Sequence, residues 1–152
     1  MSVTHHDFTI VRTFPYTRAQ VFDAWADPAK KERWFGADPD FSEGKRAFDF
    51  RVGGREHDSA THTSGVRHTM DAEYTNIVPD ERIVYTYSMT LDDKPLSTSV
   101  TCVTFQDVEG GTLMTFVEHG VHLDGIDDGS MREAGTNGIL DALGAALGTI
   151  YA

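Results

Sequence analysis

The sequence predicts an α+β domain in which a strongly curved antiparallel sheet wraps around a long C-terminal helix, with two short helices after the first strand. Three observations predict this class. Residues 47–120 alternate between apolar and polar side chains in runs joined by short turns, as in an antiparallel meander. From residue 130 onward, apolar side chains recur at helical spacing. No linker or internal repeat divides residues 1–152, so a single domain is expected.

A change of apolar spacing marks the first strand and the first helix. Residues 8–14 (FTIVRTF) alternate as a strand does. Thr17 is the predicted N-cap of a helix over residues 18–26, whose apolar side chains are three and four positions apart. This helix should end before Asp27, because the residue preceding Pro28 avoids the α region.

A second short helix is expected over residues 29–35 (AKKERWF). Pro28 falls in its first turn, where the missing N–H does no harm. Lys30, Lys31 and Arg33 make a small basic spot. The simplest interpretation is a solvated helix face, and a docking site is the alternative.

The strands of the sheet follow a loop rich in glycine and aspartate. They are expected over residues 47–52, from Arg55 onward, and over residues 66–78, 82–89, 99–108 and 112–120. Gly53 and Gly54 allow the positive φ angles of a tight two-residue turn. The return strand from Arg55 to Ser59 carries no apolar side chain. It is therefore either a solvated edge or a strand whose inner face borders a polar cavity.

A long helix closes the chain. Ser130 is its predicted N-cap, with Glu133 three residues later completing a capping box. The residues of its apolar stripe are Leu140, Leu143, Leu147 and Ile150. Only the inner face of the sheet is available to bury that stripe. Four glycines in this helix indicate either close approach of the backbone to the sheet or space left open beside it.

Composition limits the partners and the compartment. With 13 basic and 24 acidic residues the net charge is −11, which argues against nucleic acid or an anionic membrane surface as a partner. Cys102 is the only cysteine, so an intrachain disulfide and a cysteine-based zinc site are excluded. No stretch approaches the ~20 apolar residues of a membrane span, and the N-terminus lacks a signal-peptide pattern. A cytoplasmic protein without membrane insertion is expected.

Four segments taken in order resemble a known superfamily. They are RTFPYTRAQVFDAWADPAKKERWFG, FDFRVGGRE, IVPDERIVYTY and EHGVHLDGIDDGSMREAGT. Over about residues 8–148 the chain resembles the START-like helix-grip superfamily (SRPBCC, which includes polyketide cyclases). Within it, the chain looks most like homologues of the activator of heat-shock protein 90 ATPase. The resemblance implies a helix-grip fold with a deep cavity between the long helix and the sheet, often used for hydrophobic small molecules.

One position departs from this branch. Many of its members carry Gly-Trp where this chain has Gly135-Thr136, and that tryptophan packs over the cavity. The smaller side chain of Thr136 implies a larger or differently capped pocket. Ligand preferences therefore should not be copied from relatives that carry the tryptophan.

Three carboxylates are candidates for the interior. Period-two alternation places Glu118 on the inner face of the last strand. The resemblance places Glu56 and Asp58 inward as well. Three carboxylates in one pocket would raise the pKa of at least one and make Glu118 a candidate general acid or base. Alternatively, Glu56 and Asp58 lie on a solvated edge and Glu118 makes a structural ion pair. The arginines that could neutralise these acids are Arg12, Arg51 and Arg132.

Aromatic side chains are the more credible ligand contacts, since they offer ring faces and, for tyrosine, a hydroxyl. The predicted ligand-binding residues are Trp34, Phe50, Glu56, Asp58, Tyr85, Tyr87, Phe116, Glu118 and Thr136. The spacing of the histidines fits no metal motif, so they are expected at the surface or the cavity rim, with His5 and His6 in a frayed terminus. Neither a metal nor a cofactor is predicted.

Three functions remain open at this stage. The first is binding of a small, largely hydrophobic molecule without turnover. The second is an enzyme of the cyclase or hydrolase kind that uses Glu118 for proton transfer. The third is a co-chaperone-type interaction module acting through the sheet or the basic spot. The corresponding partners are a small hydrophobic molecule, a chaperone, and a second copy of the chain.

Overall fold

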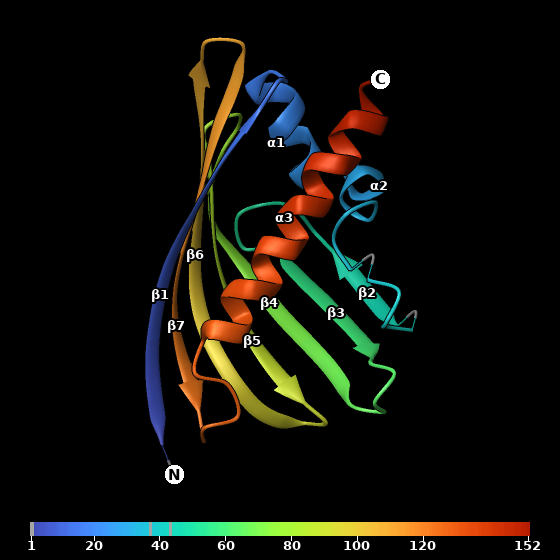
Figure 1. The fold of residues 1–152 in the computed structure, drawn as a ribbon, viewed down its shortest axis with the longest axis vertical. Coiled ribbons are helices and arrows are strands. Elements are labelled where there is room, and N and C mark those ends of the chain that lie inside the picture. Colours follow the sequence, from blue (N-terminus) through green and yellow to red (C-terminus); the bar gives the residue numbers. More distant parts are fainter. Residues whose placement is uncertain (1, 37, 43) are drawn as a thin grey trace.

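A seven-stranded antiparallel sheet and one long helix make up most of the described chain (Figure 1). The computed structural model describes residues 2–36, 38–42 and 44–152. In chain order the elements are β1 (Val3–Phe14), α1 (Arg18–Ala26), α2 (Pro28–Lys31), β2 (Lys45–Phe48), β3 (Arg55–Thr61), β4 (Arg67–Val78), β5 (Arg82–Leu91), β6 (Lys94–Val108), β7 (Gly111–Leu123) and α3 (Ser130–Ile150). This arrangement confirms the predicted fold class.

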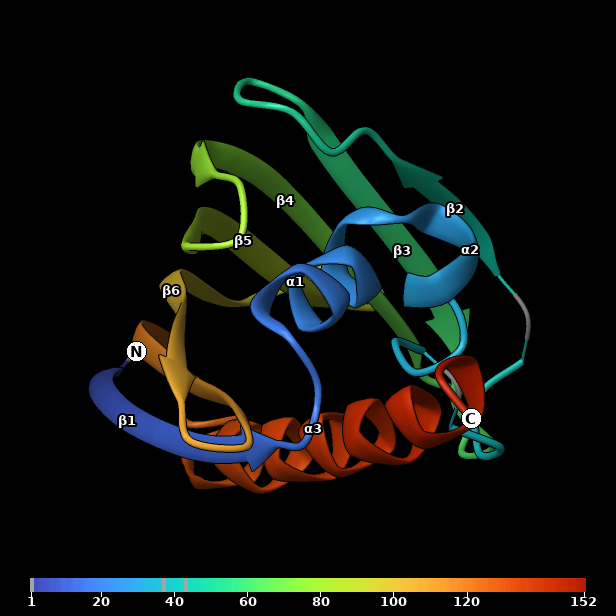
Figure 2. The same cartoon turned by 90° about the horizontal axis from the view of Figure 1, so that it is seen from above.

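The strand order is β1-β7-β6-β5-β4-β3-β2, with antiparallel pairing throughout. The first strand of the chain pairs with the last, so β1 forms one edge and the short β2 forms the other. Figure 2 shows the sheet curving from β1 round to β2, with α3 near β1 and the two short helices inside the curve. The concave face therefore meets α3 on one side and α1 and α2 at one end.

The hydrophobic core fills the part of the concave face next to α1. Val103 and Met114 on the last two long strands are fully buried there. Leu140, Leu143 and Leu147 of α3 are at most 1% exposed, which confirms the predicted stripe. Each such side chain contributes about 1.5–3 kcal/mol when it leaves water. Burial of these side chains holds α3 across the sheet.

The two helix starts differ from each other. Thr17 is the N-cap of α1 as predicted: its Oγ1 accepts from the Gln20 amide at 3.1 Å, and the Gln20 side chain accepts from the Thr17 amide. At α3 the predicted capping box is wrong. The N-cap is Gly129 at φ +101°, and the Asp128 carboxylate accepts from the amide and the hydroxyl of Ser130. A tight turn before the helix places aspartate, rather than serine, over the free backbone donors.

The loop between β2 and β3 is also longer than the predicted Gly-Gly turn. β2 ends at Phe48, and residues 49–54 form an irregular connection that pairs with β4. Gly53 N donates to Tyr74 O at 2.8 Å, and Tyr74 N donates to Gly54 O at 3.0 Å. A Cβ on Gly54 would lie 2.1 Å from Asp49 O, so this loop requires glycine for its close backbone approach.

Two further boundaries shift. β1 begins at Val3, so His6 lies in a paired strand and not in a frayed terminus. The second helix ends at Lys31 instead of residue 35. On α3, Gly135 and Gly138 face open space, whereas Gly144 lies against Phe14.

In residues 2–36, 38–42 and 44–152, no helix combines the length and hydrophobicity that a membrane crossing needs.

Candidate functional site

The inner face of β6 and β7 changes from apolar to polar along the strands. The apolar end carries the facing pair Val103 and Phe116. Toward the first turn of α3 the facing pairs become Thr101 with Glu118, Ser99 with Gly120, and Ser97 with His122. All six are buried. The sheet therefore presents a buried polar patch beneath the N-terminal part of α3.

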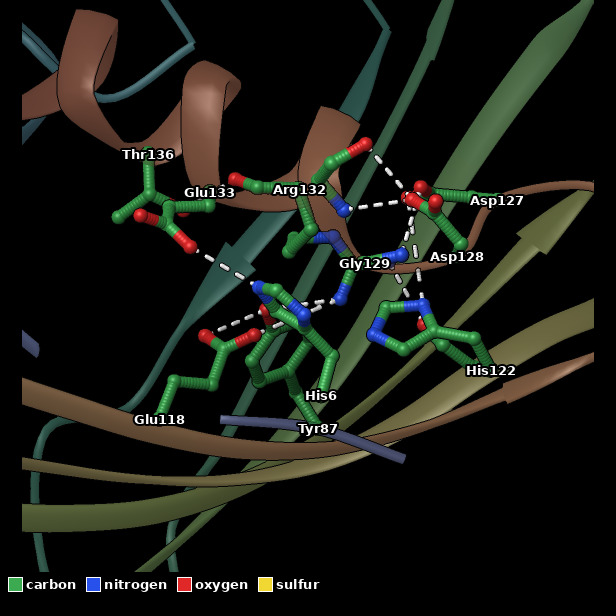
Figure 3. Close-up of polar contacts among 12 residues, drawn as sticks. His6, Tyr87, Glu118, His122, Asp127, Asp128, Gly129, Arg132, Glu133 and Thr136 are labelled. Carbon is green, nitrogen blue, oxygen red and sulfur yellow. Dashed lines mark hydrogen bonds and ion pairs between the residues drawn. The ribbon is translucent and has the colours of Figure 1, made fainter. Parts of the chain in front are cut away.

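Glu118 is the centre of this patch (Figure 3). It is 1% exposed. Its Oε1 accepts from the Tyr87 hydroxyl at 2.8 Å and from Thr101 Oγ1 at 3.2 Å. The prediction that Glu118 points inward is confirmed, and Tyr87 and Thr101 hold one of its two oxygens in place.

Arg132 brings the first turn of α3 into contact with the patch. Its Nη1 donates to the Tyr87 hydroxyl at 3.0 Å, and its Nη2 donates to Ser97 Oγ at 2.7 Å. Nη1 also lies 3.7 Å from Glu118 Oε2. The Tyr87 hydroxyl thus accepts from the guanidinium and donates to the carboxylate, so of the three predicted arginines it is Arg132 that neutralises Glu118.

Part of the hydrogen-bonding capacity of the patch is unused. Among the described residues, Glu118 Oε2, Ser99 Oγ and His122 Nδ1 are buried and have no hydrogen-bond partner. Burial raises the pKa of Glu118, although Tyr87 and Arg132 oppose the shift. Buried polar atoms normally find partners, so Glu118 Oε2 and Ser99 Oγ mark a place that a bound molecule could fill, whereas His122 Nδ1 faces Asp127.

The prediction that His122 lies at the surface or the cavity rim is wrong. It lies in β7, is 1% exposed, and has its Nδ1 3.9 Å from Asp127 Oδ2. Burial, followed by the charge of Arg132, lowers its pKa. Period-two alternation continues one step beyond Gly120 and turns this side chain inward.

Glu56 forms a second buried cluster. Its Oε1 accepts from Lys31 Nζ at 2.7 Å and from the Tyr74 hydroxyl at 2.6 Å, and Lys31 Nζ also donates to that hydroxyl at 3.1 Å. Lys31 is 3% exposed, and its ammonium lies 4.7 Å and 4.6 Å from the ring centroids of Phe35 and Phe48. Burial lowers the pKa of Lys31, and Glu56 opposes the shift.

The prediction of a basic spot on the second helix is therefore wrong. Lys31 is buried against Glu56, Lys30 pairs with Asp23, and Arg33 donates to Thr149. Each cation is held by a partner that lies elsewhere in the chain. The three side chains do not form a free docking surface.

The three predicted carboxylates do not form one unscreened acidic pocket. Glu56 and Glu118 are both inward, but each has its own cation. Asp58 is partly buried on the same face of β3, and burial raises its pKa. Tyr85 lies between the two clusters, since its β-sheet partners are Tyr74 and Thr101. Opposite charges separate the acids because uncompensated carboxylates are costly to bury together.

The other predicted arginines serve other contacts. Arg12 pairs with Asp141 of α3, and Arg51 pairs with Asp49 in the loop after β2. Both pairs involve exposed carboxylates. Neither arginine reaches the buried acids.

The predicted aromatic contacts divide into core and site. Trp34 and Phe116 are 1% and 4% exposed within the hydrophobic core, and Phe50 packs against that core. Tyr85 and Tyr87 lie on the polar part of the inner face. Thr136 is buried in α3, where its hydroxyl donates to the carbonyl of Arg132, one turn earlier. It therefore supports the helix turn that carries the guanidinium.

Beyond Tyr85 and Tyr87 the inner face becomes apolar again and is only partly buried. Met70 and Met89 face each other across β4 and β5. Asp58 lies opposite Met70 on β3. Two open surface hollows lie elsewhere, one beside α1 and α2 and one against β2 to β4. The partly covered methionines thus form an apolar border of the buried polar patch.

Several residues of this site were missed from the sequence. They are Lys31, Met70, Tyr74, Met89, Ser97, Ser99, Thr101 and His122. Alternation in the strand that carries Val103 and Phe105 places the three hydroxyl residues of β6 on the same inner face, so a signal for them existed. Nothing local in the sequence indicates that Lys31 reaches Glu56.

Histidines elsewhere do not gather around a metal. His57 pairs with Asp71 at 2.6 Å, and His62 and His68 both pack against Phe41. Within the part of the chain that the structure describes, no three His, Cys, Asp or Glu side chains come together as metal ligands.

Comparisons with known proteins agree with this architecture. The protein Mll3558 from Rhizobium loti is 41% identical over 96% of this chain and 99% of its own, with a TM-score of 0.88. An uncharacterized protein from Rhizobium leguminosarum is 38% identical over 97% of each chain, with a TM-score of 0.93. An AHSA1-like protein from Aeromonas hydrophila shares the fold at 23% identity, over 95% of this chain and 94% of its own, with a TM-score of 0.67.

No curated protein matches the chain. The family model described as activator of Hsp90 ATPase homolog 1-like protein matches residues 15–148, which is most of the sequence. The match spans α1 through α3, and thus includes every strand of the sheet except β1. The chain therefore belongs to the activator of Hsp90 ATPase homolog 1-like family, the branch of the START-like superfamily that its sequence resembles.

Proposed function

We propose that this protein binds a small, largely apolar molecule on the concave face of the sheet, beneath α3. The observation that carries the proposal is the contact between two unlike surfaces. Partly buried Met70 and Met89 border a buried polar patch in which Glu118 and Ser99 keep unpartnered oxygens. Such a combination of apolar walls and a few convergent polar groups is typical of small-molecule sites.

The apolar border suits a ligand of variable shape. Methionine side chains are flexible and polarizable, so they adapt to the molecule that covers them. Tyr85, which lies between the two buried carboxylate clusters, adds a ring face farther along the inner face of β5. The START-like fold commonly binds hydrophobic ligands, which supports the same role for this family member.

The test is a ligand screen with a site-blocking variant. Thermal shift across a library of small lipids and aromatic compounds should reveal binders that native mass spectrometry retains. Met89→Arg places a charge on the apolar border and should abolish the shift. Ser88→Arg changes the neighbouring exposed residue, which points to the convex face, and should keep it. No shift with any compound, or equal loss in both variants, would contradict binding at this face.

A second candidate is proton transfer by Glu118. Burial raises the pKa of this carboxylate, and a raised pKa brings a carboxyl group closer to the range in which it can exchange a proton at neutral pH. Glu118→Gln should then abolish conversion of a molecule identified in the screen, while Glu73→Gln on the convex face should not. Unchanged conversion in Glu118→Gln would rule out this role.

A third candidate is a chaperone partner, which the description of the matching family favours. The arrangement of α2 supplies no free basic surface for it, because Lys31 is buried and Lys30 is paired. Stimulation of the ATPase activity of a bacterial Hsp90-type chaperone by the purified protein would support this role. An ATPase rate that does not change at saturating protein would contradict it.

A further inference from the structure

The polar end of the concave face carries two buried oxygens that bear on the ligand head group, an inference that rests on the proposed binding function. Glu118 Oε2 and Ser99 Oγ are buried without a hydrogen-bond partner, on residues that are 1% and 3% exposed. An ionised carboxylate oxygen can only accept a hydrogen bond. A ligand donor would therefore satisfy Glu118 Oε2, whereas a ligand acceptor would leave it unpaired.

Gly120 lets two polar side chains of the inner face come close to the backbone of β7. It faces Ser99 across the β6–β7 pair, and a Cβ built on it would come within 3.0 Å of Ser99 Oγ and 2.9 Å of His122 Nε2. Any larger residue would crowd both polar atoms. The absence of a side chain thus lets the serine hydroxyl and the imidazole pack closely against the strand on the inner face.

One cation and several carboxylates surround Glu118 Oε2. Arg132 Nη1 lies 3.7 Å from Glu118 Oε2, so an incoming ammonium would meet the guanidinium and an incoming carboxylate would meet Glu118. Asp127, 3.9 Å from His122, and Glu133, 2.9 Å from His6, add negative charge at the border. A carboxylate is therefore the head group that this site disfavours most, and an uncharged donor meets no like charge.

We propose that the ligand carries an uncharged hydrogen-bond donor, a hydroxyl or an N–H, which donates to Glu118 Oε2, while its apolar remainder lies along Met70 and Met89. Ser99, which neighbours the Glu118 carboxylate, can then hydrogen-bond to the same head group, since a hydroxyl both donates and accepts. Arg132 and Tyr87 orient Glu118 and need not contact the ligand. The site is thus selective for neutral alcohols or amides over fatty acids and amines.

Matched probes test this inference on the intact protein. Octanol, octyl methyl ether, octylamine and octanoate share one alkyl chain and differ in the head group. Calorimetry at neutral pH should show that octanol binds at least about tenfold more tightly than the ether, because a hydrogen bond to a charged group is lost in the ether. Octylamine should bind more weakly than octanol, and octanoate should be the weakest of the four.

Variants show which residues produce the preference for one head group over another. Glu118→Gln replaces an acceptor oxygen by an amide of the same shape and should erase the preference for octanol over the ether. Ser99→Ala should reduce octanol affinity without affecting the ether. Glu73→Gln, on the convex face, should keep the full preference. Circular dichroism and a urea midpoint for each variant show that it is folded.

The outcomes separate the two proposals. If octanoate or the ether binds as tightly as octanol, binding at this face stands and the head-group inference is overturned. The same holds if Glu118→Gln keeps the octanol preference unchanged. If none of the four probes binds and the wider library also gives no shift, the proposed function fails, and the inference falls with it.

Discussion

Arg132 and Glu118 face each other beneath α3, with 3.7 Å between Nη1 and Oε2 and no hydrogen bond between them. The Tyr87 hydroxyl joins them indirectly, since it accepts from the guanidinium and donates to Glu118 Oε1. The pair thus neutralises a buried charge but leaves one carboxylate oxygen free. Removing Arg132 and removing Glu118 should therefore change the free energy of unfolding by different amounts.

Arg132→Met leaves Glu118 buried without a cation. The free energy of unfolding at neutral pH should fall by about 3 kcal/mol, since an uncompensated buried charge is costly. Urea denaturation measures the loss. The double variant Arg132→Met with Glu118→Gln removes that charge and should recover part of it. Two variants whose effects simply add would show that the residues are not coupled.

Lys31 and Lys30 are adjacent in sequence but differ in environment. Lys31→Met leaves Glu56 buried and unpaired, and should lower the free energy of unfolding by about 3–5 kcal/mol. Lys30→Met breaks a partly exposed pair with Asp23 and should cost no more than about 1 kcal/mol. Urea midpoints of the two variants provide the comparison. Equal losses would contradict the buried pair.

His122 should make stability depend on pH. Its folded pKa is lowered below the ordinary value of 6.5, so the unfolded chain takes up a proton at a higher pH than the native protein does. The free energy of unfolding should therefore fall as the pH drops below about 6.5. Urea denaturation of His122→Asn between neutral and mildly acidic pH should show a smaller fall.

His119→Asn is the matched control for this pH dependence. His119 is exposed on the same strand, so His119→Asn shows what the same substitution does outside the buried site. The raised pKa of Glu118 contributes the opposite slope in more acidic solution, but it does so in all three proteins and cancels in the comparison. If the free energy of unfolding falls with decreasing pH equally in the two variants, the prediction for His122 is contradicted.

Two glycines of the α3 region should respond in opposite ways to alanine. Gly129 has φ +101°, and a Cβ on it would lie 2.3 Å from His6 Cβ, so Gly129→Ala should destabilise the protein clearly. Gly135 faces open space inside the helix, so Gly135→Ala should stabilise by about 0.5–1 kcal/mol. Thermal denaturation of both variants measures the difference, and a shift of the same sign in both would contradict it.

The order of the elements and the faces of their side chains follow from local patterns in the sequence. Glu118 could be assigned to the inner face, and Leu140, Leu143 and Leu147 to the buried stripe of α3, because the repeats of a strand and a helix are local properties of the chain. The same alternation extends to Ser99 and His122. Helix starts and turn lengths were less predictable, as Gly129 and the loop after Phe48 show, because several local hydrogen-bonding patterns compete there.

Which charged side chains meet depends on long-range packing. Lys31 and Glu56 lie 25 positions apart, and no local pattern links them. Arg132 reaches Ser97 and Tyr87 only because the curvature of the sheet brings β5 and β6 beneath the first turn of α3. A buried charge requires a partner whatever its distance along the chain, and the position of that partner depends on how the whole sheet closes around the helix.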